Sequence, residues 1–404
     1  MYRLLAGMRV VEASSFVASP TAGLYLAQMG AEVIRVDQIG GGPDYRRWPK
    51  AGNGASLYWE GLNKGKKSLA LNLSDPAGRE MLAALATAPG DKAGLFLTNF
   101  PVDGFLSHSR LARRRADLVT VRIMGQADGG PALDYTVNSA LGIPLITGPE
   151  SLGDEPVNHV LPAWDLLTGA YAAFAMLAAH HHRAATGEGQ EVRIPLADVG
   201  IATIANLGQL AETLLSGDRP RYGNAVFGAF GRDFLTADGR RLMIMAITPR
   251  QWRGLVDVLG LAEAVAAIET ARGVSFDTDE GLRFEHRDAL FPLVEAAMAQ
   301  RRCDELAAAL DAAGCCWGPY RAMHEAVRDP VLVTGNPVFS EIEQASGTRY
   351  PVPGAMATIP QAERLAPQRA PRLGEHSDQV LAECLGLDSG QIGALHDKGL
   401  VAGA

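Results

Sequence analysis

Apolar residues in the first 125 positions form short runs separated by segments of helical character. The expected strands are Met8–Ala13, Ala31–Asp37, Lys67–Leu73, Gly94–Phe100 and Leu118–Met124. Between the first two, Ser19-Pro20 opens a helix that Gly30 ends, and Ser74-Asp75-Pro76 opens another that ends near Ala86. Strands that alternate with helices of this length predict an α/β fold with a parallel, doubly wound sheet.

A long apolar segment, Leu166–Ala179, predicts a buried helix that begins near Asp165 and ends near His182. A strand at Gln190–Leu196 and a helix from Asp198 to about Leu215 follow. Beyond the linker Ser216–Pro220 the pattern of expected helices and strands changes, and it predicts a smaller α+β domain. Its expected elements are a hairpin over Asp233–Met243 with Asp238-Gly239 at the turn, and helices near Gln251–Leu259, Phe284–Ala299 and Cys303–Ala313.

Residues 329–371 are rich in proline and predict an extended connector, and two short helices are expected near Ser377–Leu385 and Ser389–Lys398. Three parts are therefore expected. They are the N-terminal part of a large domain at 1–215, a small α+β domain at 216–328, and a proline-rich return with C-terminal helices at 329–404 that completes the large domain.

Composition and charge disfavour several classes of protein. A formal net charge of −8 disfavours a general nucleic-acid-binding surface. The four cysteines lack zinc-type spacing, and we expect them to be reduced thiols, with Cys315-Cys316 in a buried strand or turn. No signal-peptide pattern opens the chain and no apolar run has the length of a membrane span, so a cytoplasmic protein is expected.

Several apparent motifs favour ordinary structural explanations. Gly40-Gly41-Gly42 is more typical of a turn than of a phosphate loop, and His180-His181-His182 of an exposed helix end than of a metal site. The basic cluster Arg110, Arg113, Arg114 and Arg115 is more typical of a solvated surface than of a phosphate site. No metal-binding motif is found, and GxSxG, HExxH and CxxC are absent.

Two features keep a functional explanation open. Asp165 opens the apolar helix, so its carboxylate would either cap the helix or act as a nucleophile that forms an acyl intermediate. The segment Gly223–Gly231 is rich in glycine and is either a flexible linker or a lid that excludes water from a bound intermediate.

The order of several segments resembles the class III CoA-transferase family, which includes formyl-CoA transferase, carnitine CoA-transferase and the α-methylacyl-CoA racemases. These segments are LAGMRVVEASSFVASP, LAQMGAEVIRVD, LNKGKKSLALNL, LTNFP, ATGEGQEVRIPLADV, FLTADGRR and APRLGEHSDQVL. The resemblance implies a Rossmann-like large domain, a small domain, and two ring-like chains interlocked in a homodimer. A narrower likeness, in GGGPDYRRWP, VNHVLPAWD and GNAVFGAFGRDF, is to family members that move CoA between the C1 and C4 carboxyls of 2-methylfumaryl-CoA (mesaconyl-CoA).

The resemblance also implies functional residues. The catalytic aspartate falls on Asp165, and the loop over the active site on Gly223, Asn224, Gly228 and Gly231. No tightly bound cofactor is implied, because CoA arrives as part of the substrate. CoA would be bound by Val17, Ala18, Gln38, Leu71, Asn99, Phe100, Met124 and Gln126. Gln38 departs from the arginine of the formyl-CoA transferase pattern, so Arg46 or Lys64 would have to meet the phosphates.

Three alternatives stay open. An intermolecular transferase acting on a short acyl- or dicarboxylyl-CoA would use the same aspartate. A racemase would need a histidine before Asp134, after the Gly130-Pro131 turn, and that residue is Leu133. A non-catalytic CoA-binding protein would use Asp165 only as a cap. Candidates for holding the free carboxylate of a dicarboxylic substrate are Arg47, Arg232 and Tyr320.

Overall fold

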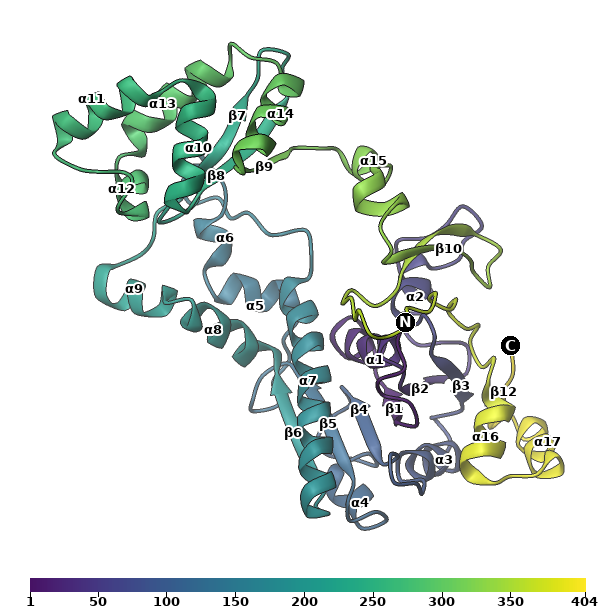
Figure 1. Cartoon of the computed structure of the whole chain (residues 1–404). Helices are drawn as coiled ribbons and strands as arrows, with labels where there is room; N and C mark the ends of the chain where they lie inside the picture. Colours follow the sequence, from purple (N-terminus) through teal and green to yellow (C-terminus); the bar gives the residue numbers. More distant parts are fainter. The chain divides into compact units, whose positions relative to one another are not determined.

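The computed structural model describes all residues, 1–404, and they form two compact units. Unit 1 contains Met1–Leu141, His159–Ala211 and Arg328–Ala404, and unit 2 contains Gly142–Asn158 and Glu212–Val327. Figure 1 labels the elements of both units. Each unit is described by itself.

Unit 1 is built on a seven-stranded sheet with the order β12-β3-β2-β1-β4-β5-β6. Six strands run parallel, and only β12 is antiparallel, next to β3. Their bounds are β1 Arg9–Ala13, β2 Glu32–Gln38, β3 Lys67–Leu71, β4 Leu95–Thr98, β5 Val119–Met124, β6 Gln190–Pro195 and β12 Val401–Ala402. The predicted α/β class with a mostly parallel sheet is confirmed.

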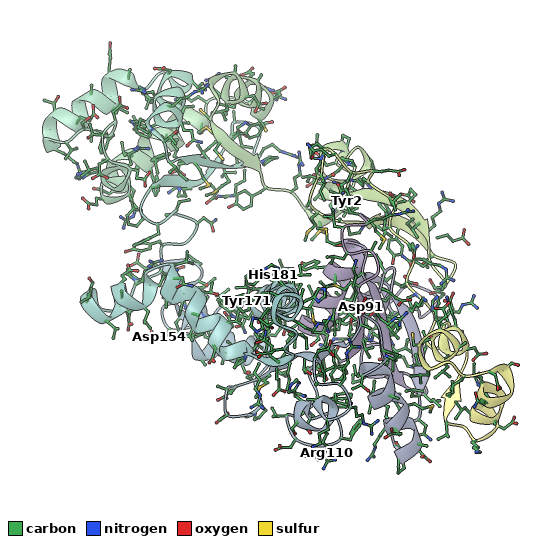
Figure 2. The ribbon with its side chains drawn as sticks, turned by 60° about the horizontal axis from the view of Figure 1, so that its bottom comes forward. Tyr2, Asp91, Arg110, Asp154, Tyr171 and His181 are labelled. Atoms are coloured by element: carbon green, nitrogen blue, oxygen red, sulfur yellow. The ribbon has the colours of Figure 1, made fainter.

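Helices cover both faces of this sheet. On one face α1 (Ala18–Gln28) and α7 (Ala163–Thr186) pack on alternate side chains of β1, β4 and β5, and Figure 2 labels Tyr171 and His181 on α7. On the other face α3 (Pro76–Ala86) and α16 (Ser377–Leu385) pack on β2 and β3. Strands buried on both faces need apolar residues at nearly every position, which is the pattern that predicted them.

The other elements of unit 1 are short. They are α2 Leu57–Leu62, α4 His108–Ala112, α5 Asp134–Ala140, α8 Leu196–Asn206, α17 Ser389–Asp397, the π-helical turn Pro330–Thr334, and the antiparallel pair β10 Phe339–Glu343 and β11 Arg349–Pro353. No helix in the chain, including the 24-residue α7, combines the length and the apolar sequence that crossing a bilayer requires.

Unit 2 contains the antiparallel sheet β7-β8-β9, formed by Phe230–Leu235, Arg241–Ala246 and Cys316–Pro319. Its helices are α6 Ile143–Ile146, the 3-10 turn Glu150–Leu152, α10 Pro249–Leu259, α11 Ala262–Arg272, α12 Glu280–Glu285, α13 Arg287–Met298, α14 Cys303–Ala313 and α15 Met323–Ala326. Helix α9 (Gln209–Ser216) spans the passage from unit 1 to unit 2. A core of buried aromatic residues around Phe230 and Trp252 joins the sheet to the helices.

Unit 2 also includes Gly142–Asn158, a segment that the sequence pattern placed in the large domain. The reason is a single buried guanidinium. Arg221 donates to the backbone carbonyls of Thr147, Gly153 and Glu155, and so fastens this segment to the part of the chain that follows α9.

Four expected elements differ from the structure. The helix expected from Asp198 to Leu215 is broken at Gly208, where φ is +79°, into α8 and α9. The helix expected over Phe284–Ala299 is divided between α12 and α13 at His286. The expected extended connector contains the β10–β11 hairpin. Prolines at 351 and 353 are atypical of strands, so the sequence pattern did not indicate it. Cys316 begins β9 but is exposed, so the expected burial of Cys315-Cys316 was wrong.

Candidate active site

Asp165 lies in the first turn of α7, at the edge of the sheet where the parallel strands end. Helix α7 leads directly into β6, so it runs against the strand direction and its N-terminus lies at the carboxyl edge. Gly169, one turn further on, packs so closely on α1 that a Cβ there would stand 2.7 Å from the Ala18 carbonyl oxygen. Asp165 is therefore fixed beside the start of α1.

The carboxylate of Asp165 does not cap its helix. The residue before the helix is Pro162, and the Asp165 side chain accepts no hydrogen bond from any residue of the chain. Partial burial, followed by repulsion from Asp134, raises the pKa of Asp165 to about 6, and Arg47 opposes the change. A half-buried carboxylate without a hydrogen-bond donor is poorly solvated, which suits a nucleophile better than a structural acid.

Asp134 performs the capping that Asp165 does not. One of its carboxylate oxygens accepts the backbone N–H groups of Trp164 at 2.7 Å and Asp165 at 3.0 Å. The other oxygen lies 2.9 Å from Nε2 of His159. In the same way Asn138, one turn along α5, accepts the indole N–H of Trp164 at 3.1 Å. Helix α5 therefore holds the beginning of α7 by side-chain contacts.

The eight predicted CoA-binding residues all lie at the carboxyl edge of the sheet or directly beyond it. Val17 and Ala18 follow β1, Gln38 ends β2, Leu71 ends β3, Asn99 and Phe100 follow β4, Met124 ends β5 and Gln126 follows it. The strand order reverses between β1 and β4, and open α/β sheets bind ligands outside the strand ends at such a reversal. The arrangement is compatible with the predicted roles.

Two of these residues have structural contacts of their own. The side chain of Asn99 accepts the N–H of Ser15 at 3.1 Å and donates to the Ser15 carbonyl at 2.9 Å, which ties the end of β4 to the loop after β1. Gln38 accepts the N–H of Leu73 at 2.7 Å. Its side-chain oxygen is thus used to join the ends of β2 and β3.

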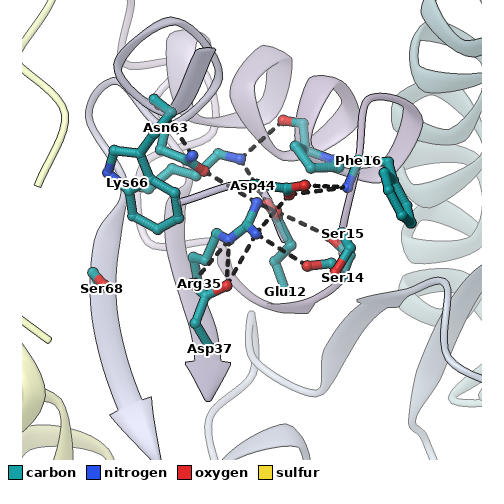
Figure 3. Close-up of polar contacts among 12 residues, drawn as sticks. Glu12, Ser14, Ser15, Phe16, Arg35, Asp37, Asp44, Asn63, Lys66 and Ser68 are labelled. Atoms are coloured by element: carbon teal, nitrogen blue, oxygen red, sulfur yellow. Dashed lines mark hydrogen bonds and ion pairs between the residues drawn. The ribbon is translucent and has the colours of Figure 1, made fainter. Parts of the chain in front are cut away.

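A buried ionic cluster supports the loop between β1 and α1 (Figure 3). Arg35 at its centre contacts Asp37 and Asp44 at 3.0 Å and Glu12 at 3.3 Å. Lys66 pairs with Glu12 at 2.8 Å, and all five side chains are almost fully buried. The cluster was not anticipated, although charged residues within otherwise apolar parallel strands were a signal for it.

The cluster acts on the site through Asp44. Both carboxylate oxygens of Asp44 accept the backbone N–H of Phe16, at 2.8 and 2.9 Å. Phe16 has a φ of +70°, the only left-handed backbone conformation outside glycine in the chain. Such a conformation costs about 1–3 kcal/mol and persists only where the surroundings fix it. The loop that begins α1 is thus held in one conformation.

Arg47 stands between two aromatic rings beside this loop. Its guanidinium lies 5.4 Å from the ring centre of Phe16 and 5.3 Å from that of Tyr58. It forms no ion pair with an acidic side chain, yet it interacts electrostatically with Asp165. The Tyr58 hydroxyl is buried without a hydrogen-bond partner, and burial followed by the charge of Asp44 raises the pKa of Tyr58. These groups offer unused donors close to the carboxylate.

A model of CoA-transferase family III matches residues 5–377. The chain belongs to this family. It is 48% identical over 406 residues to 2-methylfumaryl-CoA isomerase of Chloroflexus aurantiacus, an alignment that covers 100% of this chain and 99% of that protein. It is 30% identical to a succinate–glutarate CoA-transferase of Agrobacterium fabrum, over 94% of this chain and 95% of that protein. A CAIB/BAIF family protein from Brucella suis has the same fold, with a TM-score of 0.74 at 26% identity, over 95% of this chain and 100% of that chain.

Family membership confirms that the chain is a CoA-transferase-type enzyme, whose substrates are CoA thioesters. The Gly223–Gly231 loop of this CoA-transferase lies in unit 2, and its role over the active site stays a prediction. Within that unit, the N–H of Val226 donates to the Gly231 carbonyl at 2.8 Å and Asn224 donates to Asp233 at 2.9 Å. The loop is thus folded by contacts of its own rather than extended as a linker.

The candidates for phosphate and carboxylate binding differ in what they contact. Lys64 is buried, which together with Lys66 lowers its pKa to about 8, whereas Arg46 lines an open pocket of about 390 Å³. Arg232 pairs with Glu295 at 3.0 Å, and the Tyr320 hydroxyl faces the sulfur of Met243 at 3.8 Å.

The basic cluster of α4 is only partly a solvated surface. Arg114 pairs with the exposed Glu80, and Arg115 is engaged by Asp117 and by backbone carbonyls. Arg110 and Arg113, however, line a pocket of about 620 Å³ together with Arg79 and Phe105. The pocket lies between α3 and the segment around α4. The neighbouring Arg115 donates to the Ala88 and Gly90 carbonyls, which precede β4, so this segment runs toward the amino ends of the strands.

Proposed function

We propose that this CoA-transferase moves CoA between the C1 and C4 carboxyls of 2-methylfumaryl-CoA, with Asp165 as the covalent nucleophile. The supporting observation is the Asp165 carboxylate itself, half-buried, free of hydrogen-bond donors and located at the carboxyl edge of the sheet. The relative from Chloroflexus aurantiacus, 48% identical over the full chain, supports the choice of substrate.

The reaction follows from the chemistry of carboxylates and thioesters. Asp165 attacks the thioester carbonyl, the C–S bond breaks, CoA leaves as a thiolate, and a mixed anhydride of Asp165 and the acyl group forms. The thiolate then attacks the aspartyl carbonyl, which gives an aspartyl-CoA thioester and the free dicarboxylate. The other carboxylate attacks this aspartyl thioester, the C–S bond breaks, and a second mixed anhydride and CoA thiolate form. The thiolate finally attacks the substrate-derived carbonyl of that anhydride, which gives the isomeric thioester and regenerates the Asp165 carboxylate. Each exchange conserves an activated acyl group, so no ATP is consumed.

The mixed anhydride must be kept from water. We assign this task to the Gly223–Gly231 loop of unit 2, whose backbone N–H groups would also stabilise oxyanions. The aromatic side chain of Phe227 in this loop packs against Tyr222 and Phe284 and lies under the guanidinium of Arg219, 3.7 Å from its ring centre. A compact aromatic loop suits retention of the free acid between the two half-reactions.

Arg47 is the best-supported of the three candidates for holding the free carboxylate. It interacts with Asp165, and its guanidinium donors are not used by an acidic side chain, whereas Arg232 already pairs with Glu295. Its position between Phe16 and Tyr58 orients the planar group, as bidentate binding of a carboxylate requires. A dicarboxylic substrate would therefore place one carboxyl at Arg47 and the other at Asp165.

The CoA phosphates are assigned to the pocket lined by Arg79, Arg110 and Arg113. Phosphate groups require cationic donors, and Gln38, which joins β2 to β3, supplies no charge. Arg110 and Arg113 have no acidic partner within ion-pair distance, so their charges are available to a ligand.

A homodimer, interlocked as in the family resemblance, is part of the proposal. Leu167, Tyr171 and Phe174 repeat at helical spacing on α7 and are 39%, 52% and 62% exposed. Leu207, directly after α8, and Leu210 in α9 are also exposed. Large apolar side chains that line one face of a long helix are typical of a surface covered by another subunit.

The racemase alternative has less support. Leu133 stands where the racemase pattern has histidine, and it is largely exposed. His159 does reach Asp134 at 2.9 Å, but it lies in the segment that leads to α7 and not after the Gly130-Pro131 turn, where the racemase pattern has its base.

The decisive experiment combines trapping with labelled exchange. Hydroxylamine added with 2-methylfumaryl-CoA should convert Asp165 to a hydroxamate that mass spectrometry locates, and Asp165→Ala should abolish turnover with an unchanged circular dichroism spectrum. Turnover by Asp165→Ala would refute the nucleophile. With excess 13C-labelled free acid, the product thioester should stay unlabelled. Entry of label into the thioester would show an intermolecular transferase instead.

A further inference from the structure

His159 is joined to the start of α7 by a short chain of contacts. Its Nε2 lies 2.9 Å from one carboxylate oxygen of Asp134, and the other oxygen accepts the N–H groups of Trp164 and Asp165. Asp134 is almost fully buried. The imidazole is therefore the partner that satisfies the outer oxygen of a buried carboxylate, and the inner oxygen fixes the backbone of the nucleophile.

The imidazole ring is held in place from two sides. The ring of Tyr135 lies 5.7 Å from it and that of Trp164 lies 6.3 Å from it, both tilted. The Tyr135 hydroxyl in turn donates to the carbonyl of Val160, next to His159, at 3.2 Å. Tyr135 of α5 and Trp164 of α7 thus hold the segment that begins at His159, so the contact with Asp134 is not a chance surface pairing.

Few charged groups act on Asp165. Asp134 of α5 disfavours its ionised form, and Arg47 of the loop after β2 favours it. Tyr58 of α2 is also within electrostatic range, but its hydroxyl is uncharged at neutral pH. His159 faces Asp134 and can change that balance, because its Nε2 lies 2.9 Å from the Asp134 carboxylate.

We propose that His159 is a positioning residue that holds Asp134 against the backbone of Asp165 and, by offsetting the negative charge of Asp134, sets the pH range in which Asp165 attacks. This inference rests on the proposed role of Asp165 as nucleophile. A neutral His159 donates one hydrogen bond to Asp134, and a cationic His159 also cancels its charge. In both forms Asp165 experiences less repulsion than it would beside an unpartnered carboxylate.

The test is the acid limb of the pH profile for acyl-enzyme formation, measured as the rate of hydroxylamine trapping from pH 5 to 9. His159→Phe removes the donor and the charge, and should move the midpoint upward by roughly one pH unit. His159→Gln keeps a donor of similar reach without a proton to gain, so its midpoint should fall between those of the wild type and His159→Phe. Asp134→Asn keeps the acceptor for both backbone N–H groups and removes the repulsion, so its midpoint should move downward.

A matched control is available on the surface. His396 pairs with Asp378 at 2.7 Å in α17 and α16, and His396→Gln should leave the profile unchanged. If His159→Phe does not fold, His159→Asn, whose amide is too short to reach Asp134, replaces it.

The order Asp134→Asn, wild type, His159→Gln, His159→Phe in rising midpoint supports the proposal. Equal midpoints in all four proteins overturn it, and so does a lower melting temperature of the His159 variants with an unshifted midpoint. If Asp165→Ala is inactive while the His159 variants keep the wild-type profile, only this inference fails. If Asp165→Ala turns over substrate, the proposed function itself fails.

Discussion

Replacing Arg35 by methionine tests whether the buried ionic cluster supports unit 1 through its charges. The guanidinium contacts Asp37, Asp44 and Glu12 within 3.3 Å and donates to the Ser14 carbonyl at 3.1 Å. Lys66 would still neutralise Glu12, so the substitution leaves the two aspartates without a cation in a buried site.

Hydrogen bonds to charged groups contribute about 1.5–3 kcal/mol each, but the contacts of one residue are not additive. Removal of one partner from a buried ion pair typically costs about 3–5 kcal/mol, because it leaves an uncompensated charge in a buried site. We therefore expect the free energy of unfolding of Arg35→Met to fall by about 3–5 kcal/mol at pH 7. For a unit of this size the melting temperature would fall by roughly 5–9 °C.

The pH dependence of the stability loss distinguishes a loss of charge compensation from a loss of packing. Burial already raises the pKa of Asp44 in the folded protein, and loss of the opposing charge of Arg35 raises it further. The folded variant then binds more protons than the unfolded one, so its stability falls as the pH rises through this range. The difference from the wild type should accordingly be smaller at pH 5 than at pH 7.

Thermal unfolding followed by circular dichroism at both pH values measures the effect. Arg114→Met is the control, because Arg114 forms an exposed pair with Glu80 that should contribute less than about 1 kcal/mol. If Arg35→Met loses no more stability than Arg114→Met at pH 7, the cluster does not stabilise unit 1. An equal loss at both pH values would assign the effect to packing instead.

Four further outcomes are expected. Gly169→Val should destabilise unit 1 by about 2–3 kcal/mol in denaturant titrations, because the new side chain would collide with Ala18 and Thr21. Gly61→Ala is the control: its added Cβ meets nothing within 4 Å, so it should change stability by less than about 1 kcal/mol. Asp165→Asn should raise the free energy of unfolding, measured by denaturant titration, by about 1–2 kcal/mol at pH 8 but not at pH 4. The raised pKa of about 6 makes the ionised wild-type carboxylate destabilising above that pH, and the magnitude allows for partial exposure. Phe174→Asp should lower the mass observed by light scattering to that of one chain, and a monomeric wild type would contradict the proposed dimer. Arg110→Ala should raise KM for the CoA thioester about tenfold at nearly constant kcat, and an unchanged KM would remove Arg110 from the phosphate site.

Much of the sheet was predictable because its local signals agree with one another. The apolar runs of β1, β2 and β5 were found within one or two residues, and the Asp75-Pro76 start of α3 was found correctly. The β10–β11 hairpin was missed because proline at 351 and 353 is atypical of strands, although both residues lie in a two-stranded ribbon with free edges.

Within the candidate site, Asp165 was singled out by its place at the start of an apolar helix and by the family resemblance, and its role stays a prediction. Its surroundings were not predictable. Asp134 lies about 30 residues earlier in the chain, and nothing local shows that its carboxylate caps α7 rather than its own helix. The same holds for Asp44, whose effect on the Phe16 backbone depends on Arg35 in a neighbouring strand. Contacts of this kind join residues that come together only when the sheet has formed, so they cannot be predicted from a single sequence.

The position of β12 bears on how the enzyme is made in the cell. This short strand joins the edge of the sheet at β3, and Val380 and Leu381 of α16 cover the neighbouring apolar surface around Leu71. About 330 residues separate Leu71 from Val401, so at roughly 5–20 residues per second the ribosome needs about 15–65 seconds to supply the missing edge. Throughout that interval the nascent chain exposes an unpaired strand edge and an apolar surface. We therefore expect a chaperone to bind the chain during translation.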